Sequence, residues 1–225
     1  RIQYGTINMG AYEGGVPSDY RSVTSVSNNW SDISSWEVLN DQSTWTAATE
    51  TPTASNSQVI TINSNVIVNG NVSIDQTTVE SGATLTVNSG STLTIADGTG
   101  DDLTANGGLD INGTLSIGTA TVDANGTFDA TGGAVEFTDA GNLKLGGTEP
   151  SLGTFTKSTS TVTYDGGNQT IFPTDYYLFS FAGSTSGSTK TFGVGSTKVD
   201  QEISLTDDIT LTGSSTDAVT VQVTT

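Results

Sequence analysis

Cysteine and histidine are both absent from the 225-residue sequence. Without cysteine, the chain can form neither a disulfide framework nor a thiolate metal site. The lack of histidine removes the commonest transition-metal ligand and the usual general base near neutral pH. Both absences argue against a catalytic or zinc-binding role, and we expect no enzymatic activity in this chain.

Positive charge is also scarce. The chain carries six Lys and Arg against 24 Asp and Glu, so its formal net charge is −18. No basic patch is available to neutralise phosphates, and we therefore expect no nucleic acid as a partner. The sequence contains no apolar stretch near the ~18 residues that a membrane helix needs, so we expect no membrane insertion. The acidic balance suits a self-repelling surface that can recruit divalent cations.

Threonine, serine, asparagine and glycine make up much of the remainder. Only 33% of the residues are hydrophobic and 13% are charged, while glycine alone contributes 27 residues. Threonine is β-branched, which favours an extended backbone and crowds a helix. Val, Ile, Leu and Phe recur regularly instead of thinning out, unlike in a disordered segment. The composition predicts an all-β fold of many short strands joined by tight turns, with essentially no helix.

Short apolar segments follow one another from residue 59 onward. Nearly all of them read apolar–x–apolar, which sends two side chains to one face of a strand and the middle one to the other. They are VITI (59–62), VIV (66–68), VSI (72–74), LTV (85–87), LTI (93–95), LDI (109–111) and LSI (115–117).

Glycine-containing corners separate these segments. They are Asn69-Gly70, Ser81-Gly82, Ser89-Gly90, Asn106-Gly107, Asn112-Gly113 and Asn125-Gly126. Glycine and asparagine tolerate the positive φ that sharp corners need. Strands this short, each followed by a corner, fit a three-sided coil of roughly 20 residues. We therefore predict a right-handed parallel β-solenoid (β-helix), whose stacked corners allow asparagine ladders. Antiparallel β-sandwich repeats use the same turn signals and are the alternative.

Composition divides the chain into five segments. Residues 1–15 read as the end of a preceding β domain, and residues 16–29 as a linker. All three Trp fall within residues 30–58, where they predict a cap over the open end of a core, with a sugar-stacking platform as the alternative. Residues 59–150 are the predicted solenoid coils. Residues 151–225 hold more aromatics and are predicted to continue the solenoid or to form a second β sub-repeat, truncated at the C-terminus.

Several longer runs share one style, namely SGATLTVNSGSTLTI, GLDINGTLSIG, TSTVTYDGGNQTI and ISLTDDITLTG, preceded by NNWSDISSW. These runs resemble the repeat region of large type IX-secreted bacterial cell-surface and adhesin-like proteins. The resemblance implies a secreted, extracellular protein with a structural and adhesive role at the cell surface, and it carries over no catalytic residue. Separately, residues 1–15, with TINMGAYEGG, resemble the closing strand of a pectate-lyase-like parallel β-helix.

The loop ADGTGDDLT (96–104) gathers three carboxylates around two glycines. Asp97, Asp101 and Asp102 offer hard oxygen ligands on a flexible backbone, the kind that Ca²⁺ prefers. They are the candidate Ca²⁺ ligands, and an exposed acidic corner is the alternative interpretation. No other cofactor is predicted.

Three functions fit the sequence. The first is a structural and adhesive segment, a stalk or filament spacer, whose partners are neighbouring domains or copies of the same protein. The second is a glycan-binding adhesive module that presents aromatic faces to surface glycans. The third is a non-catalytic trailing part of a polysaccharide-degrading enzyme.

Overall fold

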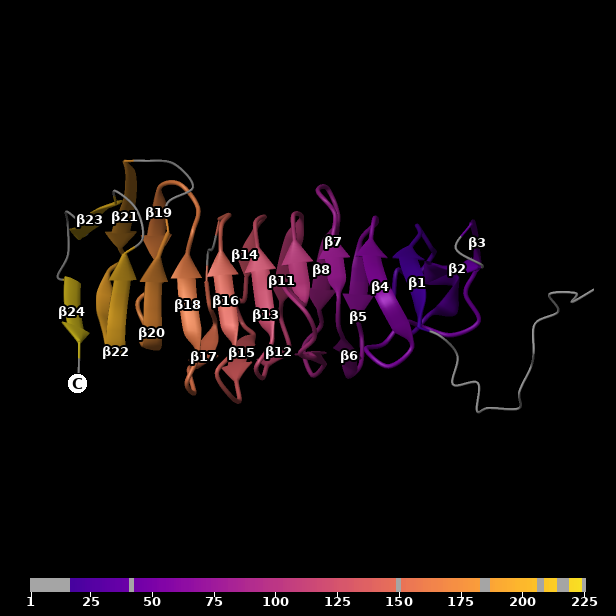
Figure 1. Ribbon diagram of the computed structural model, residues 1–225, viewed down its shortest axis with the longest axis horizontal. Helices are drawn as coiled ribbons and strands as arrows, with labels where there is room; N and C mark the ends of the chain where they lie inside the picture. The colour runs from indigo at the N-terminus through magenta and orange to yellow at the C-terminus, as the bar shows by residue number, and fades with distance from the viewer. Residues whose placement is uncertain are drawn as a thin grey trace, which may run out of the picture.

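The computed structural model describes residues 17–40, 43–148, 151–182, 187–205, 209–213 and 219–223. These residues form 24 strands and one 3-10 turn, η1 (Ile33–Ser35), and they contain no α-helix. The all-β prediction is therefore confirmed. Strands of successive turns lie side by side along the long axis of the molecule (Figure 1).

The strands form four sheets, which we name A to D. Sheet A holds β1 (Ser18–Ser22), β2 (Trp36–Asn40), β3 (Thr44–Ala47), β4 (Ser57–Ile62), β7 (Thr77–Val79), β10 (Leu103–Ala105), β13 (Thr121–Ala124), β16 (Asn142–Leu145), β18 (Thr161–Tyr164), β20 (Asp175–Phe181), β22 (Gly195–Leu205) and β24 (Val219–Val223). Sheet B holds β5 (Val66–Val68), β8 (Thr84–Val87), β11 (Gly108–Ile111) and β14 (Phe128–Asp129). Sheet C holds β6 (Val72–Ile74), β9 (Thr92–Ile95), β12 (Thr114–Ile117), β15 (Ala134–Phe137) and β17 (Thr154–Thr156). Sheet D holds β19 (Gln169–Ile171), β21 (Ser188–Phe192) and β23 (Ile209–Gly213).

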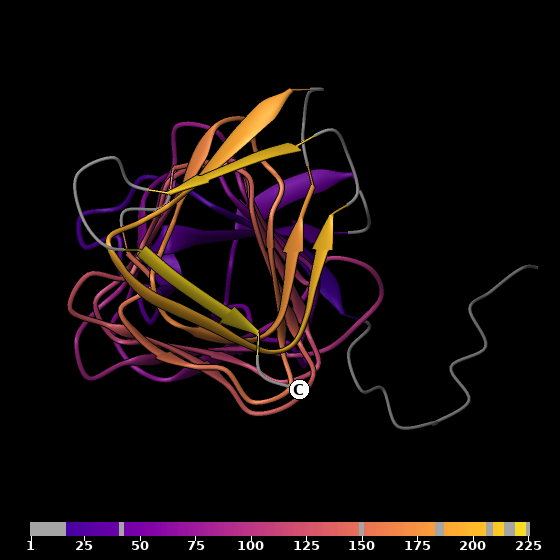
Figure 2. The same cartoon turned by 90° about the vertical axis from the view of Figure 1, so that its left-hand side faces the viewer.

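In the central region, one strand from each of sheets A, B and C makes one turn of a coil. Strands β7, β8 and β9 pair in parallel with β10, β11 and β12 of the next turn. Figure 2, which looks along the coil, shows the turns superposed around a common interior. The parallel β-solenoid, of about seven turns, is thereby confirmed, and the antiparallel sandwich is not the fold.

The core is a continuous column inside the coil. The apolar–x–apolar rule holds along it: Leu115 and Ile117 are buried, while Ser116 between them faces outward. The same side-chain positions stack in register from turn to turn, so Leu93 lies beside Leu115 and Ile95 beside Ile117. Each strand contributes only two or so inward side chains, and the hydrophobic core exists only because the turns stack.

The corners use glycine for two different reasons. In the Ser-Gly corners, Gly82 and Gly90 have φ of +91° and +79°, as predicted. The glycines of the Asn-Gly corners have no positive φ. Three of the four, Gly107, Gly113 and Gly126, are required for close packing, since a Cβ at Gly107 would lie 2.1 Å from the carbonyl oxygen of Ala83, and one at Gly126 would lie 1.9 Å from that of Gly107. Successive turns therefore approach too closely at these corners for any side chain.

The N-terminal end of the stack carries a hairpin and two buried tryptophans. Strands β2 and β3 pair antiparallel beside β1, at the end of sheet A. The rings of Trp30 and Trp36 meet edge to face, with centroids 4.6 Å apart. Their indole N–H groups donate to the carbonyl oxygens of Pro52 and Trp30, so both polar atoms are satisfied in the interior. Trp45 lies outside this pair, under the guanidinium group of Arg21 at 4.5 Å.

Part of the segment predicted as a linker is a strand instead. Strand β1 pairs in parallel with β4 and buries Tyr20 and Ser22. The Ser22 hydroxyl accepts hydrogen bonds from the backbone N–H groups of Asn63 and Ser64 in the next turn. The serine-rich composition suggested a linker because it does not reveal that one of these serines faces inward. Residues 1–15 lie outside the described residues.

Toward the C-terminus the cross-section changes. Sheet B ends at β14 and sheet C at β17, and sheet D begins at β19. The strands of sheet A lengthen at the same point, to seven residues in β20 and eleven in β22. All pairings from β18 to β24 remain parallel, so this part continues the stack.

Candidate functional site

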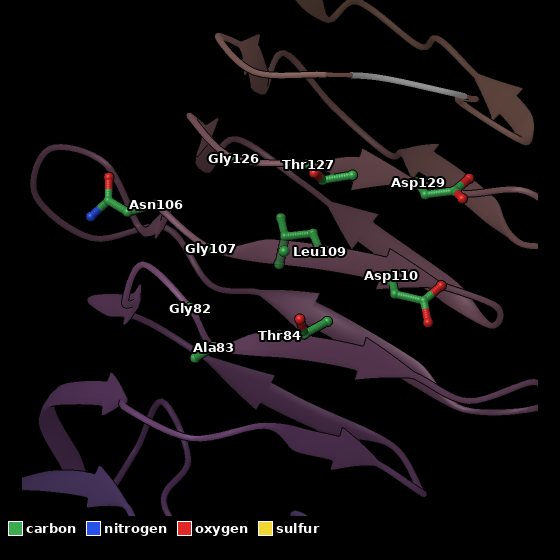
Figure 3. Close-up of a pocket in the computed structure, with 11 residues that line it drawn as sticks. Gly82, Ala83, Thr84, Asn106, Gly107, Leu109, Asp110, Gly126, Thr127 and Asp129 are labelled. Atoms are coloured by element: carbon green, nitrogen blue, oxygen red, sulfur yellow. The ribbon is translucent and has the colours of Figure 1, made fainter.

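A groove crosses three successive turns at the corner between sheets A and B. It encloses about 640 Å³, and four of its lining residues are glycines, namely Gly82, Gly107, Gly108 and Gly126. Figure 3 shows it from outside, with strands β8, β11 and β14 as its rungs. We call this feature the corner groove.

The middle one of the three turns that line the groove has a glycine where its two neighbours carry threonine. Gly108 pairs with Thr84 of the preceding turn, and Thr127 lines the groove at the following turn. A Cβ at Gly108 would lie 3.0 Å from Oγ1 of Thr84, so a side chain there would occupy the space between the two threonines. The backbone at Gly108 has no positive φ, so its conformation does not require glycine, and the absence of a side chain there contributes to the depression.

Two carboxylates in register form one wall of the corner groove. Asp110 pairs with Asp129 of the next turn. Oδ1 of Asp110 accepts a hydrogen bond from Nδ2 of Asn112 at 3.0 Å, and Oδ1 of Asp129 accepts the N–H of Thr131 at 2.9 Å. Neither carboxylate belongs to an ion pair within the described ranges. Like charges on neighbouring rungs repel, so hydroxyl or amine donors entering the groove would relieve this pair.

Asn106 lies on the loop opposite these carboxylates (Figure 3). Its Oδ1 accepts a hydrogen bond from Nδ2 of Asn125 in the next turn, at 3.5 Å. This contact is of the kind that would build the asparagine ladder which the repeated Asn-Gly corners allow. The corner groove thus combines carboxylate, amide and hydroxyl groups around a glycine floor, which is a chemistry suited to ligands rich in hydroxyl groups.

The candidate Ca²⁺ loop is organised around the buried Asp102. One carboxylate oxygen accepts the N–H of Gly98 and the other accepts the N–H of Thr121, both at 2.7 Å. Burial raises the pKa of Asp102 against the lowering effect of these two hydrogen bonds, and the charges of Asp75 and Asp97 raise it further. Asp102 therefore ties its own loop to the next turn.

The other two candidate ligands contact different partners. Asp97 accepts a hydrogen bond from the Thr119 hydroxyl at 2.7 Å, and Asp101 pairs with Nζ of Lys144 at the same distance. In the part of the chain that the structure describes, no group of three or more acidic side chains is arranged to hold a metal. The structure therefore brings Asp97, Asp101 and Asp102 into one loop but directs each to a separate contact, and calcium binding stays a prediction.

A row of charges runs along the outward face of sheet A. Lys144 pairs in register with Asp123, and Asp165 follows the next strand of the sheet. Burial raises the pKa of Asp165, and the Asp123 charge raises it further, against the opposing charges of Lys144 and Lys190. Burial acts to lower the pKa of Lys144, but its hydrogen bond to Asp101 and the surrounding carboxylates outweigh burial and raise it.

Comparisons with protein-family models, with curated proteins and with solved structures each find no match for this chain. Within the described ranges, no helix has the length and apolar character to cross a membrane.

Sequence reasoning did not identify the corner groove. Its signal is present but small: GLDI carries glycine at the position where TLTV, its partner strand in the preceding turn, carries threonine. That difference becomes informative only when β11 is paired with β8, because the register then puts Gly108 beside Thr84 and Asp110 beside Thr86.

Proposed function

We propose that the chain is a structural and adhesive segment of a large secreted cell-surface protein, and that it acts outside the cell as an elongated spacer. The stacking pattern is the observation that carries this proposal. In the central region each strand pairs only with the turn before and the turn after, as β10 does with β7 and β13. A stack of this kind can grow in length without needing a larger core.

The surface chemistry supports the same role. A net charge of −18 on 225 residues favours solubility and disfavours nonspecific aggregation of the stack. The partners in this proposal are the domains on either side of the chain, or further copies of the same protein. The sequence resemblance to secreted surface repeats supports an extracellular location.

A display experiment tests the spacer function. The chain is inserted between a bacterial surface anchor and a small affinity tag, with a flexible Gly/Ser linker of equal residue number as the control. We expect the solenoid to hold the tag farther from the surface, so that bulky antibodies reach it more readily through the surrounding polysaccharide. Equal accessibility with both inserts would contradict the proposal.

The corner groove favours glycan binding as a second candidate function. Its two in-register carboxylates, Asp110 and Asp129, line, together with four glycines, a depression that crosses three turns. Carboxylate oxygens accept strong hydrogen bonds from hydroxyl groups, and the net charge disfavours acidic polysaccharides. The favoured ligand is therefore a neutral or amino-bearing oligosaccharide chain.

A glycan array with the purified chain tests the second candidate. Gly108→Leu fills the depression and Asp110→Asn removes one carboxylate, so both variants should lose at least tenfold in binding, equivalent to about 1.4 kcal/mol. Thr94→Ala, on the exposed face of sheet C, is the matched control and should bind like the wild type. Absence of binding by the wild type, or unchanged binding by both groove variants, would exclude the corner groove as a glycan site.

A further inference from the structure

The sequence contains four Asn-Gly pairs, at positions 69, 106, 112 and 125. In such a pair the glycine nitrogen can attack Cγ of the asparagine, because glycine has no side chain to obstruct the approach. A cyclic succinimide forms as the Cγ–Nδ2 bond breaks, and the proton lost by the glycine nitrogen is taken up by the departing Nδ2 group, which leaves as ammonia. Solvent water then opens the ring at either carbonyl, giving aspartate or isoaspartate. The step requires a glycine N–H free of hydrogen bonds and a backbone that can bend toward the side chain.

In three of the four pairs, the fold hinders this reaction. Each of their glycines donates its N–H to a carbonyl oxygen of the preceding turn. The bonds run from Gly107 to Val79 at 3.2 Å, from Gly113 to Val87 at 2.9 Å and from Gly126 to Ala105 at 2.9 Å. A Cβ at any of these glycines would lie within 2.3 Å of a backbone oxygen, so the surrounding backbone leaves no room for bending.

The pair Asn69-Gly70 differs in each respect. Both residues are exposed, and no atom lies within 4 Å of a Cβ built on Gly70. In the part of the chain that the structure describes, neither the Gly70 N–H nor the Asn69 amide makes a hydrogen bond. The cause is position. Sheet B begins at β5, and the backbone bridge that the structure shows on its open side joins Asn29 to Ile67, two residues before Asn69, so this corner has no preceding turn of sheet B beneath it.

We propose that Asn69 is a spontaneous modification site, at which the folded protein converts asparagine into aspartate and isoaspartate while the other three Asn-Gly pairs stay intact. The product adds one negative charge at the corner between β5 and β6. Isoaspartate also adds a methylene group to the backbone there, in the first full turn beside the tryptophan-bearing hairpin. The modified corner would then distinguish aged from newly made molecules.

Peptide mapping by mass spectrometry tests the proposal on the intact chain, after incubation in mildly alkaline buffer. We expect Asn69 to react at least about tenfold faster than Asn106, Asn112 or Asn125, since one net hydrogen bond changes the open population by roughly that factor. The chain unfolded in urea is the reference, and there the four pairs should react at similar rates. Gly70→Ala is the matched variant, because its added Cβ meets no atom yet obstructs cyclisation, and it should slow the reaction at residue 69 alone.

The possible results separate cleanly. Preferential reaction at Asn69 that Gly70→Ala suppresses, with an unchanged circular dichroism spectrum, supports the proposal. Equal rates at the four pairs in the folded chain would overturn it, because the hydrogen bonds would then give no protection. A folded chain in which Asn69 stays intact while the unfolded chain reacts would overturn it as well.

Discussion

The central turns and the C-terminal turns fill the same coil with different side chains. Along one inward column of sheet A, the central turns contribute Leu103, Val122 and Leu143, all buried and aliphatic. The same column reaches Phe179 after Val162, where the strands of sheet A become longer. Along this column, aliphatic side chains fill the turns with short sheet A strands, and a phenylalanine ring fills the turn in which the sheet A strand is longer.

Aromatic residues of the C-terminal turns form a connected cluster. Tyr176 stacks on Phe179 with ring centroids 4.3 Å apart and an interplanar angle of 2°, and Phe181 lies 4.5 Å from Phe179. Phe155, in the last strand of sheet C, contacts Tyr176 at 5.7 Å. This contact joins the two regions, so aromatic rings from both regions pack together where sheet C ends.

A buried polar network accompanies the rings. Lys190 points inward and is completely buried, and its ammonium group donates to the carbonyl oxygens of Gly166 and Gly167 at 2.9 and 3.0 Å and contacts Oε1 of Gln169. The Gln169 amide in turn donates to the carbonyl oxygen of Leu145 at 2.7 Å. The backbone carbonyls at this corner are satisfied by side chains as well as by the next turn, which distinguishes it from the central corners.

Removal of a ring from the middle of the C-terminal aromatic cluster should produce the largest loss of stability. Phe179→Ala is expected to lower the free energy of unfolding by about 3–5 kcal/mol, since it leaves a cavity within the ring cluster. Val122→Ala, in the same column of the central turns, should cost roughly 2 kcal/mol because it removes less buried surface. Urea unfolding followed by circular dichroism measures both. Equal losses would mean that the two interiors are packed alike.

Removal of the buried ammonium group of Lys190 should produce the second largest loss of stability. Lys190→Met keeps the length of the side chain but leaves its carbonyl partners unpaired, which should cost about 1.5–3 kcal/mol. Lys198→Met, on an exposed position of β22, is the control and should stay within about 0.5 kcal/mol of the wild type. Thermal unfolding of the two variants side by side measures the difference. A Lys190→Met protein as stable as the wild type would show that the polar network does not stabilise the C-terminal turns.

The corner glycines should behave alike in both regions. A Cβ at Gly126 would lie 1.9 Å from a backbone oxygen, and one at Gly166 would lie 2.1 Å from another. Each substitution by alanine should therefore cost about 1–2 kcal/mol through backbone displacement. Gly108→Ala meets only a threonine side chain that can rotate, so its melting temperature should stay near that of the wild type. A clear difference between Gly126→Ala and Gly166→Ala would separate the two kinds of corner.

The smallest expected effect depends on pH. Burial raises the pKa of Asp165 in the folded protein above its unfolded value of ~3.9, so ionisation of this group opposes folding. Its stabilising contribution is complete below that unfolded pKa and is lost as the pH rises through the folded pKa. Asp165→Asn should thus raise stability at neutral pH by less than about 1 kcal/mol, since the group is partly exposed and screened. Melting curves should show this advantage shrinking with acidification, and a constant advantage at every pH would contradict the assignment.

Features that depend on neighbouring residues could be predicted from the sequence, whereas contacts between turns could not. The alternation in segments such as VITI and LSI predicted which side chains are buried, because that alternation depends on neighbouring residues only. The partners of Asp97, Asp101 and Asp102 come from other turns, and their separate directions require the register. Lys190 shows most clearly what the sequence could not predict. It shares the buried face of β21 with Phe192, and the carbonyl groups of the preceding turn explain why a lysine can occupy that face.

The parallel stacking of the turns also has a mechanical consequence. The hydrogen bonds between turns run along the long axis, so tension between the two ends loads them one turn at a time. Val122 follows its partner Leu103 by nineteen residues, and a released turn of that length can extend to roughly 65 Å. A stack pulled from both ends would therefore lengthen in steps, dissipating load as successive turns peel from an end while the remaining turns keep their shape.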